Sequence, residues 1–280
     1  MKRVLVTGAN GQLGKSIHRI SSNYPELKII FTDVEELDIT KAEEVNAFFE
    51  KHAFDYCINC AAYTAVDKAE EEVDKAFLIN ATAVKNLAEA CKPEAVLIHI
   101  STDFVFDGGK RTPYTEEDTP NPLSVYGKSK LKGELFIQEI LDRHFIVRTS
   151  WLYSEYGNNF VKTMLRLADT RDEISVVNDQ IGSPTYAGDL ASLLLEIVKG
   201  DTAKYGIYHY SNEGEISWHD FAVEIFKHHK KDVRVIPIPT SSYPTAAKRP
   251  GYSVLDSNNV CKMIKFQTFI WDVSLSQIKL

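Results

Sequence analysis

The stretch Lys2–Gly14 reads KRVLVTGANGQLG, and it decides the fold of this 280-residue chain. Its first six residues form a short apolar and β-branched run, which predicts a buried strand. The pattern then becomes helical, so the glycines that follow lie on a turn between a strand and a helix. These glycines, at three-residue spacing, are Gly8, Gly11 and Gly14.

Each glycine of this turn has a separate expected task in binding a dinucleotide. Gly8 permits the tight turn, Gly11 lets backbone amides approach a pyrophosphate, and Gly14 lets the helix pack closely. The positive end of the helix dipole would face the phosphates. The spacing differs from the usual G-x-G-x-x-G, and a plain turn is the alternative. The position directly after an N-terminal strand favours the nucleotide site.

Composition and charge limit the classes of protein to which the chain can belong. It is 44% hydrophobic and 25% charged, which is typical of a globular protein of one large domain or slightly more. The net charge of −7 argues against nucleic acid as a partner. No apolar run approaches the roughly 20 residues of a membrane span, and the first strand starts at Lys2. We therefore expect a cytoplasmic protein that does not contact a membrane.

The four cysteines and eight histidines show no metal-binding spacing. Cys57 and Cys60 form a C-x-x-C, but the segment around them reads as a strand, where residues three apart point to opposite faces. Buried reduced thiols are therefore expected instead of a redox or metal centre. No metal ligands are assigned.

Strands alternate with helices over the first 150 residues. Further strands are expected at residues 27–32, 54–59, 95–101 and 144–148. This alternation predicts an α/β fold with a Rossmann-type, doubly wound parallel sheet, whose ligands bind at the carboxyl ends of the strands. Asp33 follows the second strand, where a carboxylate can accept hydrogen bonds from an adenosine ribose; a simple turn aspartate is the alternative. The predicted site lies where four residues follow the carboxyl ends of predicted strands, namely Gly8, Asp33, Ala61 and Thr102.

In the second half of the chain strands and helices alternate less regularly, which indicates a smaller lobe covering the substrate. Residues 1–150 are expected to form the dinucleotide-binding domain, with later additions to its sheet and helices near 174–200 and 233–240. The lobe is expected to comprise residues 151–173, 201–232 and 241–280.

A tyrosine and a lysine four residues apart occur in the helix expected over residues 124–141. Tyr126 and Lys130 share a face of this helix, and an ammonium beside a phenol lowers the tyrosine pKa. The pair can therefore protonate a carbonyl that accepts hydride. Thr102 can donate a second hydrogen bond to the same oxygen. A Y-x-x-x-K pair also occurs by chance on solvated helices. The catalytic interpretation is favoured because Thr102 and the glycine turn accompany the pair.

These motifs resemble those of the extended short-chain dehydrogenase/reductases, and among them the dTDP-4-dehydrorhamnose reductases. The resemblance covers almost the whole chain and is most specific at DQIGSPTY and RPGYSVLD, outside the cofactor half. It also includes TGANGQLG, LDIT, NCAAYTAVDKAE, STDFVFDG and YGKSKLKGE. The resemblance implies NAD(P)H-dependent reduction of the C4 ketone of a dTDP-linked sugar, with a small nucleotide sugar as the substrate.

The resemblance also implies roles for individual residues. Tyr126 would be the proton donor, and Lys130 would bind the nicotinamide ribose and tune Tyr126. The substrate would be contacted by Thr102, Asp103, Trp151 and Arg249, the last of which suits a diphosphate. The cofactor would be contacted by Gly11, Gln12, Leu13, Asp38, Ile39, Ala61, Ala62 and Tyr63. From the residues alone, Arg249 reads equally as a surface ion pair, and Trp151 as core packing.

The residues around the glycine turn also bear on cofactor choice and on metal binding. Asp33 favours NADH, whereas Lys15 could reach the 2′-phosphate of NADPH, so use of both cofactors is predicted. Some relatives bind Mg²⁺ at a dimer interface through a carboxylate just after the third glycine. Lys15-Ser16 stands there in this chain, which argues against a metal-bridged dimer. A monomer and a homodimer both stay open.

Two other functions also stay open. One is another nucleotide-sugar enzyme of the same superfamily, such as an epimerase. Sugar dehydratases of the superfamily have the sequence T-D-E at the end of the fourth strand and use its acidic residues to eliminate water. In this chain Phe104 follows Thr102-Asp103, so the eliminating acid is absent. The other is a non-catalytic regulatory subunit that keeps a nucleotide site, as the β subunit of methionine adenosyltransferase does.

Overall fold

The computed structural model describes residues 1–92 and 94–278, and a parallel six-stranded sheet forms its centre. The strand order is β10-β5-β4-β3-β1-β2, and each neighbouring pair is parallel, as predicted. The chain passes from β1 to β2 on one side and then returns to β3 on the other. Open α/β sheets bind ligands at this kind of reversal. The strands are β1 (Lys2–Thr7), β2 (Leu27–Phe31), β3 (Tyr56–Asn59), β4 (Val96–Thr102), β5 (His144–Thr149) and β10 (Gly206–His209).

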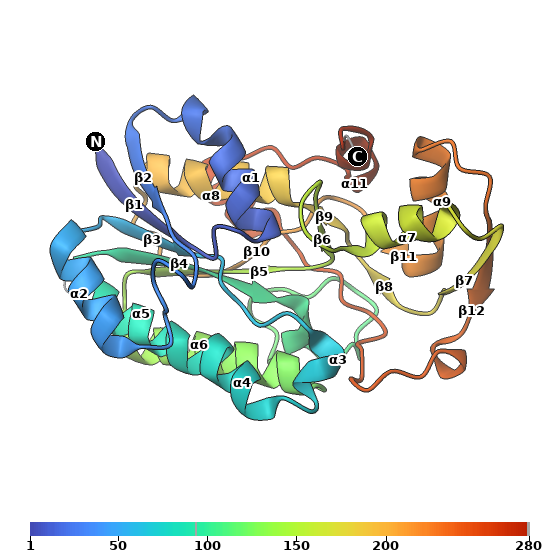
Figure 1. Cartoon of the computed structure of the whole chain (residues 1–280), viewed down its shortest axis with the longest axis horizontal. Coiled ribbons are helices and arrows are strands. Elements are labelled where there is room, and N and C mark those ends of the chain that lie inside the picture. The colour runs from blue at the N-terminus through green and yellow to red at the C-terminus, as the bar shows by residue number, and fades with distance from the viewer. Residues whose placement is uncertain (93, 279–280) are drawn as a thin grey trace.

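Helices cover both faces of the sheet (Figure 1). One face packs against α1 (Gln12–Ile20), α8 (Ala187–Gly200) and α10 (Asn258–Ile264). The other packs against α2 (Ala42–His52), α5 (Ala83–Cys91) and α6 (Val125–Ile140). Before α5 come α3 (Val66–Ala69), α4 (Val73–Phe77) and a π-helical turn, Leu78–Thr82. Because both faces are buried, the strands are almost continuously apolar.

The two cysteines of the C-x-x-C lie on opposite faces of the sheet, as the strand periodicity predicts. Cys57 belongs to the core beneath α2 and α5, whereas Cys60 packs against the core beneath α1 and α8. Both are free thiols. The motif therefore does not place its two sulfur atoms at one site.

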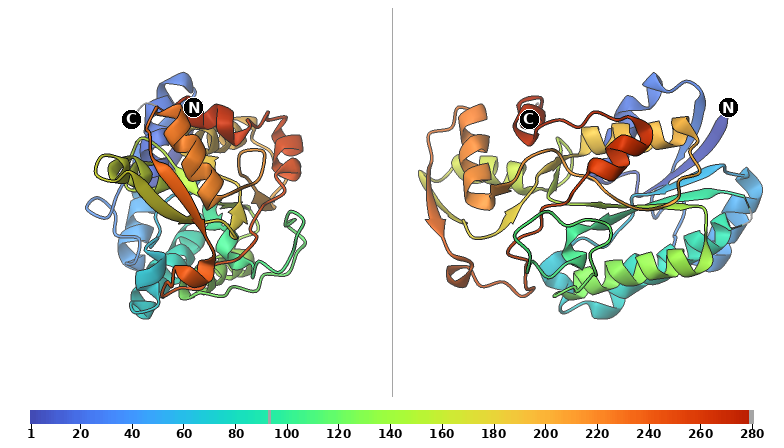
Figure 2. Two further views of the ribbon diagram at one scale, coloured as in Figure 1. Left: turned by 90° about the vertical axis from the view of Figure 1, so that its right-hand side faces the viewer. Right: turned by 180° about the vertical axis from the view of Figure 1, so that it is seen from behind.

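A smaller lobe stands beyond the carboxyl ends of the strands, and Figure 2 shows it end-on. Its core contains α7 (Phe160–Ala168), α9 (Trp218–His228), α11 (Trp271–Ser276) and the parallel strands β7 (Glu173–Val177) and β12 (Arg234–Ile238). Two shorter pairs are β6 (Leu152–Tyr153) with β9 (Thr185–Tyr186), and β8 (Ile181–Gly182) with β11 (Ile216–Ser217). Among the described residues, no helix has the length and hydropathy needed to cross a bilayer.

The strand pairing corrects the predicted division of the second half in two places. β7 and β12 do not extend the main sheet but pair with each other in the lobe. β10, predicted in the lobe, pairs with β5 as the sixth strand of the sheet, and Val260 of α10 packs beside that sheet. A hydrophobic pattern identifies a strand but not its neighbour, which long-range packing decides. Residues 279–280 of the last predicted segment lie outside the described residues.

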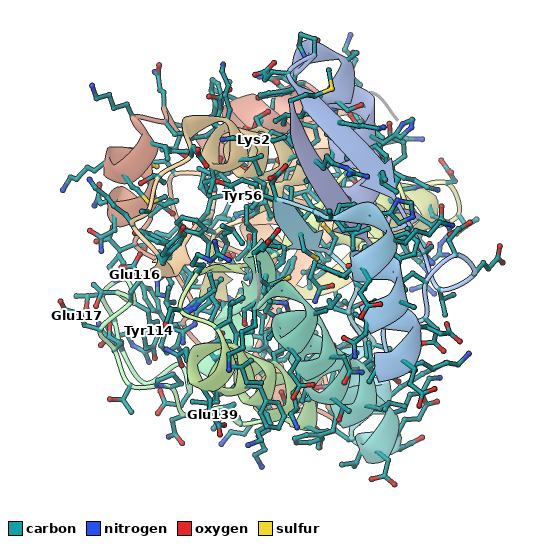
Figure 3. The ribbon with its side chains drawn as sticks, turned by 90° about the vertical axis from the view of Figure 1, so that its left-hand side faces the viewer. Lys2, Tyr56, Tyr114, Glu116, Glu117 and Glu139 are labelled. Atoms are coloured by element: carbon teal, nitrogen blue, oxygen red, sulfur yellow. The ribbon has the colours of Figure 1, made fainter. Side chains whose placement is uncertain are left out.

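The long connection after β4 is held by contacts along the edge of the sheet. It starts with a 3-10 turn, Asp103–Val105, and Tyr114 then stacks on Phe106 with ring centroids 4.1 Å apart. The Glu116 carboxylate accepts a 3.0 Å hydrogen bond from the backbone N–H of His209 on β10. Figure 3 labels Tyr114 and Glu116 on this side of the molecule. These contacts hold the connection that leads from β4 to α6.

Candidate active site

The glycine-rich turn between β1 and α1 has the geometry of a phosphate-binding site. Gly8 has a φ of +64°, and a Cβ atom there would lie 2.6 Å from the backbone nitrogen of Ala61. Glycine is thus required both by the backbone conformation and by the close approach of the loop after β3. Gly11 is the N-cap of α1, and no described side chain caps this helix. Its first N–H groups are therefore suited to binding an anion.

Polar groups from neighbouring strand ends meet at this edge of the sheet. The Asp33 carboxylate, after β2, accepts a 2.8 Å hydrogen bond from the backbone N–H of Asn10 in the glycine turn. Asp38 accepts hydrogen bonds from the backbone N–H and the hydroxyl of Thr40. Ala61 and Ala62 follow β3 and are partly exposed.

Two of the residues assigned to the cofactor have side chains buried in the cores of the sheet. The side chains of Leu13 and Ile39 are buried in the two cores of the sheet, with exposed fractions of 4% and 7%. They can therefore offer a ligand only their backbone atoms.

A buried asparagine holds the loop after β3. Asn80, in the π-helical turn, accepts a 2.8 Å hydrogen bond from the N–H of Tyr63 and donates to the Tyr63 carbonyl at 3.0 Å. It also donates to the Ser129 hydroxyl of α6 at 3.0 Å. Mid-helix π turns frequently mark functional sites. Asn80 thus fixes Tyr63 relative to the helix that carries Tyr126 and Lys130.

Tyr126 and Thr102 meet where α6 begins below the end of β4. The Tyr126 ring lies edge-on to Phe104 with centroids 5.5 Å apart, and its phenol is hydrogen-bonded to Thr102. Burial raises the pKa of Tyr126 to about 12, although the Thr102 hydrogen bond acts in the opposite direction. The phenol is therefore protonated at neutral pH.

Lys130 is buried, and its amino group contacts β4. Its Nζ donates to the carbonyl oxygen of Ile100 at 2.6 Å and lies 3.1 Å from Nε2 of His99. Burial lowers the pKa of Lys130 to about 8. The hydrogen bond with Thr102 lowers the pKa of Tyr126 against the effect of burial. The predicted effect of Lys130 on the same pKa stays a prediction.

Sequence reasoning missed a buried polar chain that leads to Lys130. The Thr7 hydroxyl of β1 donates to Oδ1 of Asn59 at 2.7 Å, and Nδ2 of Asn59 lies 3.0 Å from Nδ1 of His99. His99 then contacts Lys130 through its other ring nitrogen. A signal was present in the sequence, because His99 interrupts the apolar strand AVLIHIS.

A second missed feature is the buried ion pair that joins α6 to β5. Arg148 Nη2 lies 2.6 Å from Glu134 Oε2, and the two side chains are 2% and 1% exposed. Arg148 Nε also donates to Glu134 Oε1 at 3.0 Å, and Ser101 of β4 donates to the same oxygen. These contacts hold α6, and with it Tyr126, against the sheet.

A cavity of about 610 Å³ opens where the lobe faces the sheet edge. Trp151 in its wall has a φ of +45°, a strained value for a non-glycine residue. Its ring stacks on Trp218 with centroids 3.4 Å apart, and a Cβ atom at Gly182 would lie 2.5 Å from it. Phe104 and Arg249 line the same cavity. The indole of Trp151 is thus held in place from both sides.

Asp103 lies buried beside this cavity. Its carboxyl is hydrogen-bonded to Thr102 and to Ser253, which lines the cavity. Burial raises the pKa of Asp103 to about 6. Its Oδ2 atom has no hydrogen-bond partner among the described residues. A buried acceptor without a described donor is an exception among polar groups in folded proteins.

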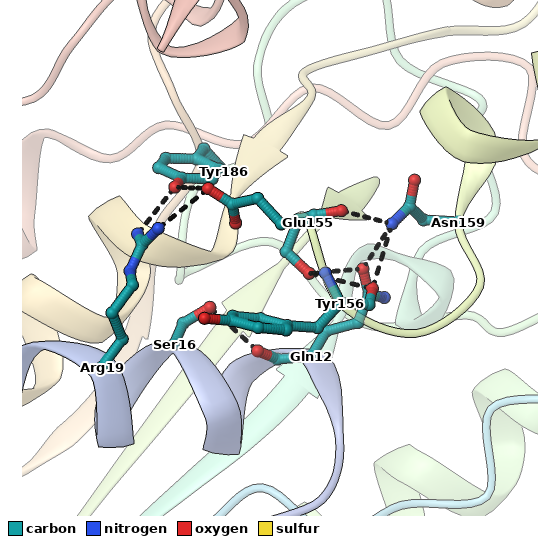
Figure 4. Close-up of polar contacts among 8 residues, drawn as sticks. Gln12, Ser16, Arg19, Glu155, Tyr156, Asn159 and Tyr186 are labelled. Atoms are coloured by element: carbon teal, nitrogen blue, oxygen red, sulfur yellow. Dashed lines mark hydrogen bonds and ion pairs between the residues drawn. The ribbon is translucent and has the colours of Figure 1, made fainter. Parts of the chain in front are cut away.

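Helix α1 also contacts the lobe directly (Figure 4). The side-chain oxygen of Gln12 accepts hydrogen bonds from Ser154 at 3.0 Å and from Asn159 at 2.8 Å. Arg19, two turns further along, pairs with Glu155 at 2.8 Å. The side chain of Gln12 therefore joins the glycine turn to the first segment of the lobe.

One group of described residues has metal-ligand chemistry, and it lies away from the glycine turn. Glu224 and His228 come from α9, and Asp272 comes from α11. His228 Nε2 lies 2.7 Å from Asp272, and Lys227 lies 2.9 Å from Glu224. Ion pairs within the lobe account for this group, so no metal is assigned to it.

The chain is similar to known proteins over its whole length. The model of the RmlD substrate binding domain family matches residues 1–279. The chain is 44% identical to the dTDP-4-dehydrorhamnose reductase of Aggregatibacter actinomycetemcomitans, over 100% of this chain and 99% of that protein.

Two solved structures of similar proteins superpose closely on the fold. One is a dTDP-4-dehydrorhamnose reductase from Clostridium acetobutylicum, with a TM-score of 0.94, 46% identity and coverage of 98% of this chain and 97% of that one. The other, from Bacillus anthracis and in complex with NADP, has a TM-score of 0.94, 45% identity and 99% coverage of both chains. The chain therefore belongs to the RmlD substrate binding domain family, the family of the dTDP-4-dehydrorhamnose reductases.

Proposed function

We propose that this chain is a dTDP-4-dehydrorhamnose reductase, which reduces the C4 ketone of dTDP-4-dehydro-β-L-rhamnose to dTDP-L-rhamnose. The observation that carries the proposal is the meeting of Thr102 and Tyr126 beside a cavity that Phe104 and Arg249 line. The full-length identity of 44% to a reductase of that name supports the choice of substrate.

The residues around the glycine turn fit a nicotinamide dinucleotide. Gly8 lets the loop after β3 approach the turn, and Gly11 begins α1 at its uncapped start, where the pyrophosphate would bind. The loop Ala61–Tyr63 would lie along the middle of the cofactor. A nicotinamide cofactor bound there would supply the hydride for reduction of the carbonyl carbon. The relative from Bacillus anthracis was solved with NADP, which supports this assignment.

The surroundings of Lys15 favour use of both NADPH and NADH. Lys15 and Arg19 line a second cavity of about 450 Å³ beside the glycine turn, where cationic groups can receive a 2′-phosphate. Asp33, which would disfavour that phosphate, accepts hydrogen bonds from the backbone N–H groups of Asn10 and Val34. The Asp33 carboxylate is thus already engaged within its own loop.

The proposed chemical role of Tyr126 follows from its protonation state. Its pKa of about 12 keeps the phenol protonated at neutral pH, so it can donate a proton to the ketone oxygen as hydride arrives. Thr102 is placed to share the same oxygen. A positioned general acid of this kind contributes about 10² to 10⁴ in rate.

The lobe is proposed to bind the nucleotide-sugar. Trp151 offers a rigid aromatic surface in the cavity wall, and Arg249 offers a guanidinium suited to a diphosphate. Asp103 would support the sugar site through Ser253, to which it is hydrogen-bonded and which lines the cavity. These contacts would place the C4 ketone at the end of β4, beside Thr102.

The test is oxidation of NADPH and of NADH by the purified protein with dTDP-4-dehydro-β-L-rhamnose, and with the dUDP- and GDP-linked analogues. We expect stoichiometric oxidation and the highest kcat/KM for the dTDP sugar. Tightly bound NAD⁺ without net oxidation would identify an epimerase instead. Cofactor binding without any turnover would identify a regulatory subunit.

A further inference from the structure

The contacts of His99 define which of its ring nitrogens carries a hydrogen. His99 is fully buried on β4, and burial lowers its pKa well below the ordinary value. The ring is therefore neutral, with one N–H donor and one acceptor nitrogen. Nδ1 faces Asn59, and Nε2 faces Lys130.

The orientation of the Asn59 amide decides between the two tautomers. Oδ1 of Asn59 accepts a 3.1 Å hydrogen bond from the backbone N–H of Ala61, which can only donate. It also accepts from the Thr7 hydroxyl at 2.7 Å. Nδ2 of Asn59 therefore points at His99 and donates to Nδ1. The hydrogen of the neutral ring is thus on Nε2, facing Lys130.

This tautomer places an N–H group 3.1 Å from Nζ of Lys130. An ammonium has three donors and no lone pair, so it cannot accept this hydrogen bond, whereas an uncharged amine can. The amine would still donate to the carbonyl of Ile100 at 2.6 Å. The chain from Asn59 through His99 is therefore complementary to the uncharged form of Lys130.

An ammonium at Lys130 would require the opposite arrangement. Nε2 of His99 would have to accept, and its hydrogen would move to Nδ1, 3.0 Å from the donor Nδ2 of Asn59. Asn59 could relieve this contact only by giving up the N–H of Ala61, in the loop where the cofactor would lie. Protonation of Lys130 thus costs about one hydrogen bond in the loop after β3.

The other ionisable groups around Lys130 come from several elements. Cys60 follows β3, and Glu134 lies one turn further along α6. The negative charge of Glu134 favours the ammonium, in opposition to burial. Burial raises the pKa of the Cys60 thiol, which therefore stays uncharged. Glu134, however, is already paired with Arg148 of β5. His99 is the group that contacts Nζ through a side chain.

We propose that His99, oriented by Asn59, is a positioning residue that stabilises the uncharged amine of Lys130. Lys130 then exchanges its proton near neutral pH instead of staying an ammonium at all working pH values. This inference rests on the proposed reductase function only for its kinetic consequences. The tautomer itself is a property of the folded chain.

The direct test is a two-dimensional proton–nitrogen correlation spectrum of the protein with isotope-labelled histidine. The His99 signals are identified by their loss in His99→Gln. We expect the hydrogen on Nε2, with Nδ1 unprotonated, at a pH one unit above the alkaline limb of the rate profile. A hydrogen on Nδ1 would overturn the proposal. Because this measurement needs no turnover, its failure is distinguishable from failure of the proposed activity.

A second test is the pH profile of kcat in His99→Gln. Glutamine offers either an oxygen or an amide group, so it accommodates an ammonium. We expect the alkaline limb to move upward by about one pH unit, the equivalent of one hydrogen bond. His144→Gln is the matched control, because His144 is also buried but contacts Leu141 at the amino end of β5, whereas the predicted site lies at the carboxyl ends of the strands. An unmoved limb in His99→Gln, or an equal shift in both variants, overturns the proposal.

Asn59→Asp tests the tautomer of His99 in a protein that still contains the His99 side chain. A carboxylate accepts only, so it would draw the hydrogen of His99 to Nδ1 and leave Nε2 free to accept from an ammonium. We expect the spectrum to change tautomer and the alkaline limb to move upward. Retention of the hydrogen on Nε2 in this variant would contradict the role assigned to Asn59.

Discussion

The guanidinium of Arg249 pairs with the carboxylate of Asp67 through contacts of 3.1 and 2.6 Å. Asp67 lies in α3, and Arg249 lies in the C-terminal segment, so the pair joins two distant parts of the chain. The ion-pair interpretation of Arg249 is therefore confirmed, whereas its contact with a diphosphate stays a prediction. Arg249 forms this ion pair, and it also lines the large cavity. A partly exposed pair of this kind contributes at most about 1 kcal/mol to stability.

Arg249→Ala is expected to raise the KM for the nucleotide sugar about tenfold or more, with a much smaller effect on the cofactor KM. Loss of a charge-assisted hydrogen bond costs about 1.5–3 kcal/mol. Asp67→Asn is the matched variant, and it should lower the sugar KM because it releases Arg249 from its acidic partner. Steady-state kinetics for both substrates measure this. An unchanged sugar KM in Arg249→Ala would show that Arg249 serves only in the ion pair with Asp67 and does not bind the substrate.

Tyr126→Phe is expected to lower kcat by about 10² to 10⁴ while cofactor binding stays near normal. The phenol is the group hydrogen-bonded to Thr102, and the phenyl ring preserves the contact with Phe104. Turnover by stopped-flow and cofactor affinity by fluorescence titration measure the two effects. Turnover within a few-fold of the unmodified protein would remove Tyr126 from the chemistry.

Glu134→Gln is expected to destabilise the fold by about 3–5 kcal/mol, because it leaves the buried guanidinium of Arg148 without a charge partner. Urea unfolding measures this loss. Asp169→Asn, which breaks the exposed pair with Lys231, is the control and should leave the unfolding midpoint nearly unchanged. Equal unfolding midpoints for the two variants would show that the buried ion pair contributes no more to stability than the exposed one.

Asp103→Asn is expected to change the pH dependence of stability. Burial raises the pKa of Asp103 from 3.8 to about 6, so the folded protein holds a proton that the unfolded chain releases. This contribution to stability is fully present below pH 3.8 and is lost as the pH rises through about 6. Asparagine has no such loss, so the variant should gain stability relative to the unmodified protein across this window. Thermal unfolding on both sides of the window measures it, and parallel curves would contradict it.

Asp33→Ala is expected to shift cofactor preference toward NADPH, because it removes the carboxylate nearest to the predicted 2′-phosphate position. The unmodified protein should use both cofactors with a preference below about tenfold, or 1.4 kcal/mol. Lys15→Ala should shift the preference in the opposite direction. The ratio of kcat/KM values at one ionic strength measures both changes. Discrimination beyond about a hundredfold, or no shift in either variant, would exclude these residues as determinants.

Much of the fold and part of the site can be predicted from local sequence. The strand periodicity and the glycine turn predicted the parallel sheet and the alignment of Gly8, Asp33, Ala61 and Thr102 at its edge. These features are accessible because the side-chain period and the conformation of a turn depend on residues close together in the chain.

The tertiary structure decided which distant groups meet. The sequence could not show that β10 completes the sheet, nor that β7 and β12 pair in the lobe. Nor could it show that Lys130 faces His99, or that Arg249 faces Asp67. These contacts join residues between 31 and 182 positions apart. Helical spacing places Tyr126 and Lys130 on one face, but the partner of each side chain depends on which buried polar groups the packed sheet and lobe bring within reach.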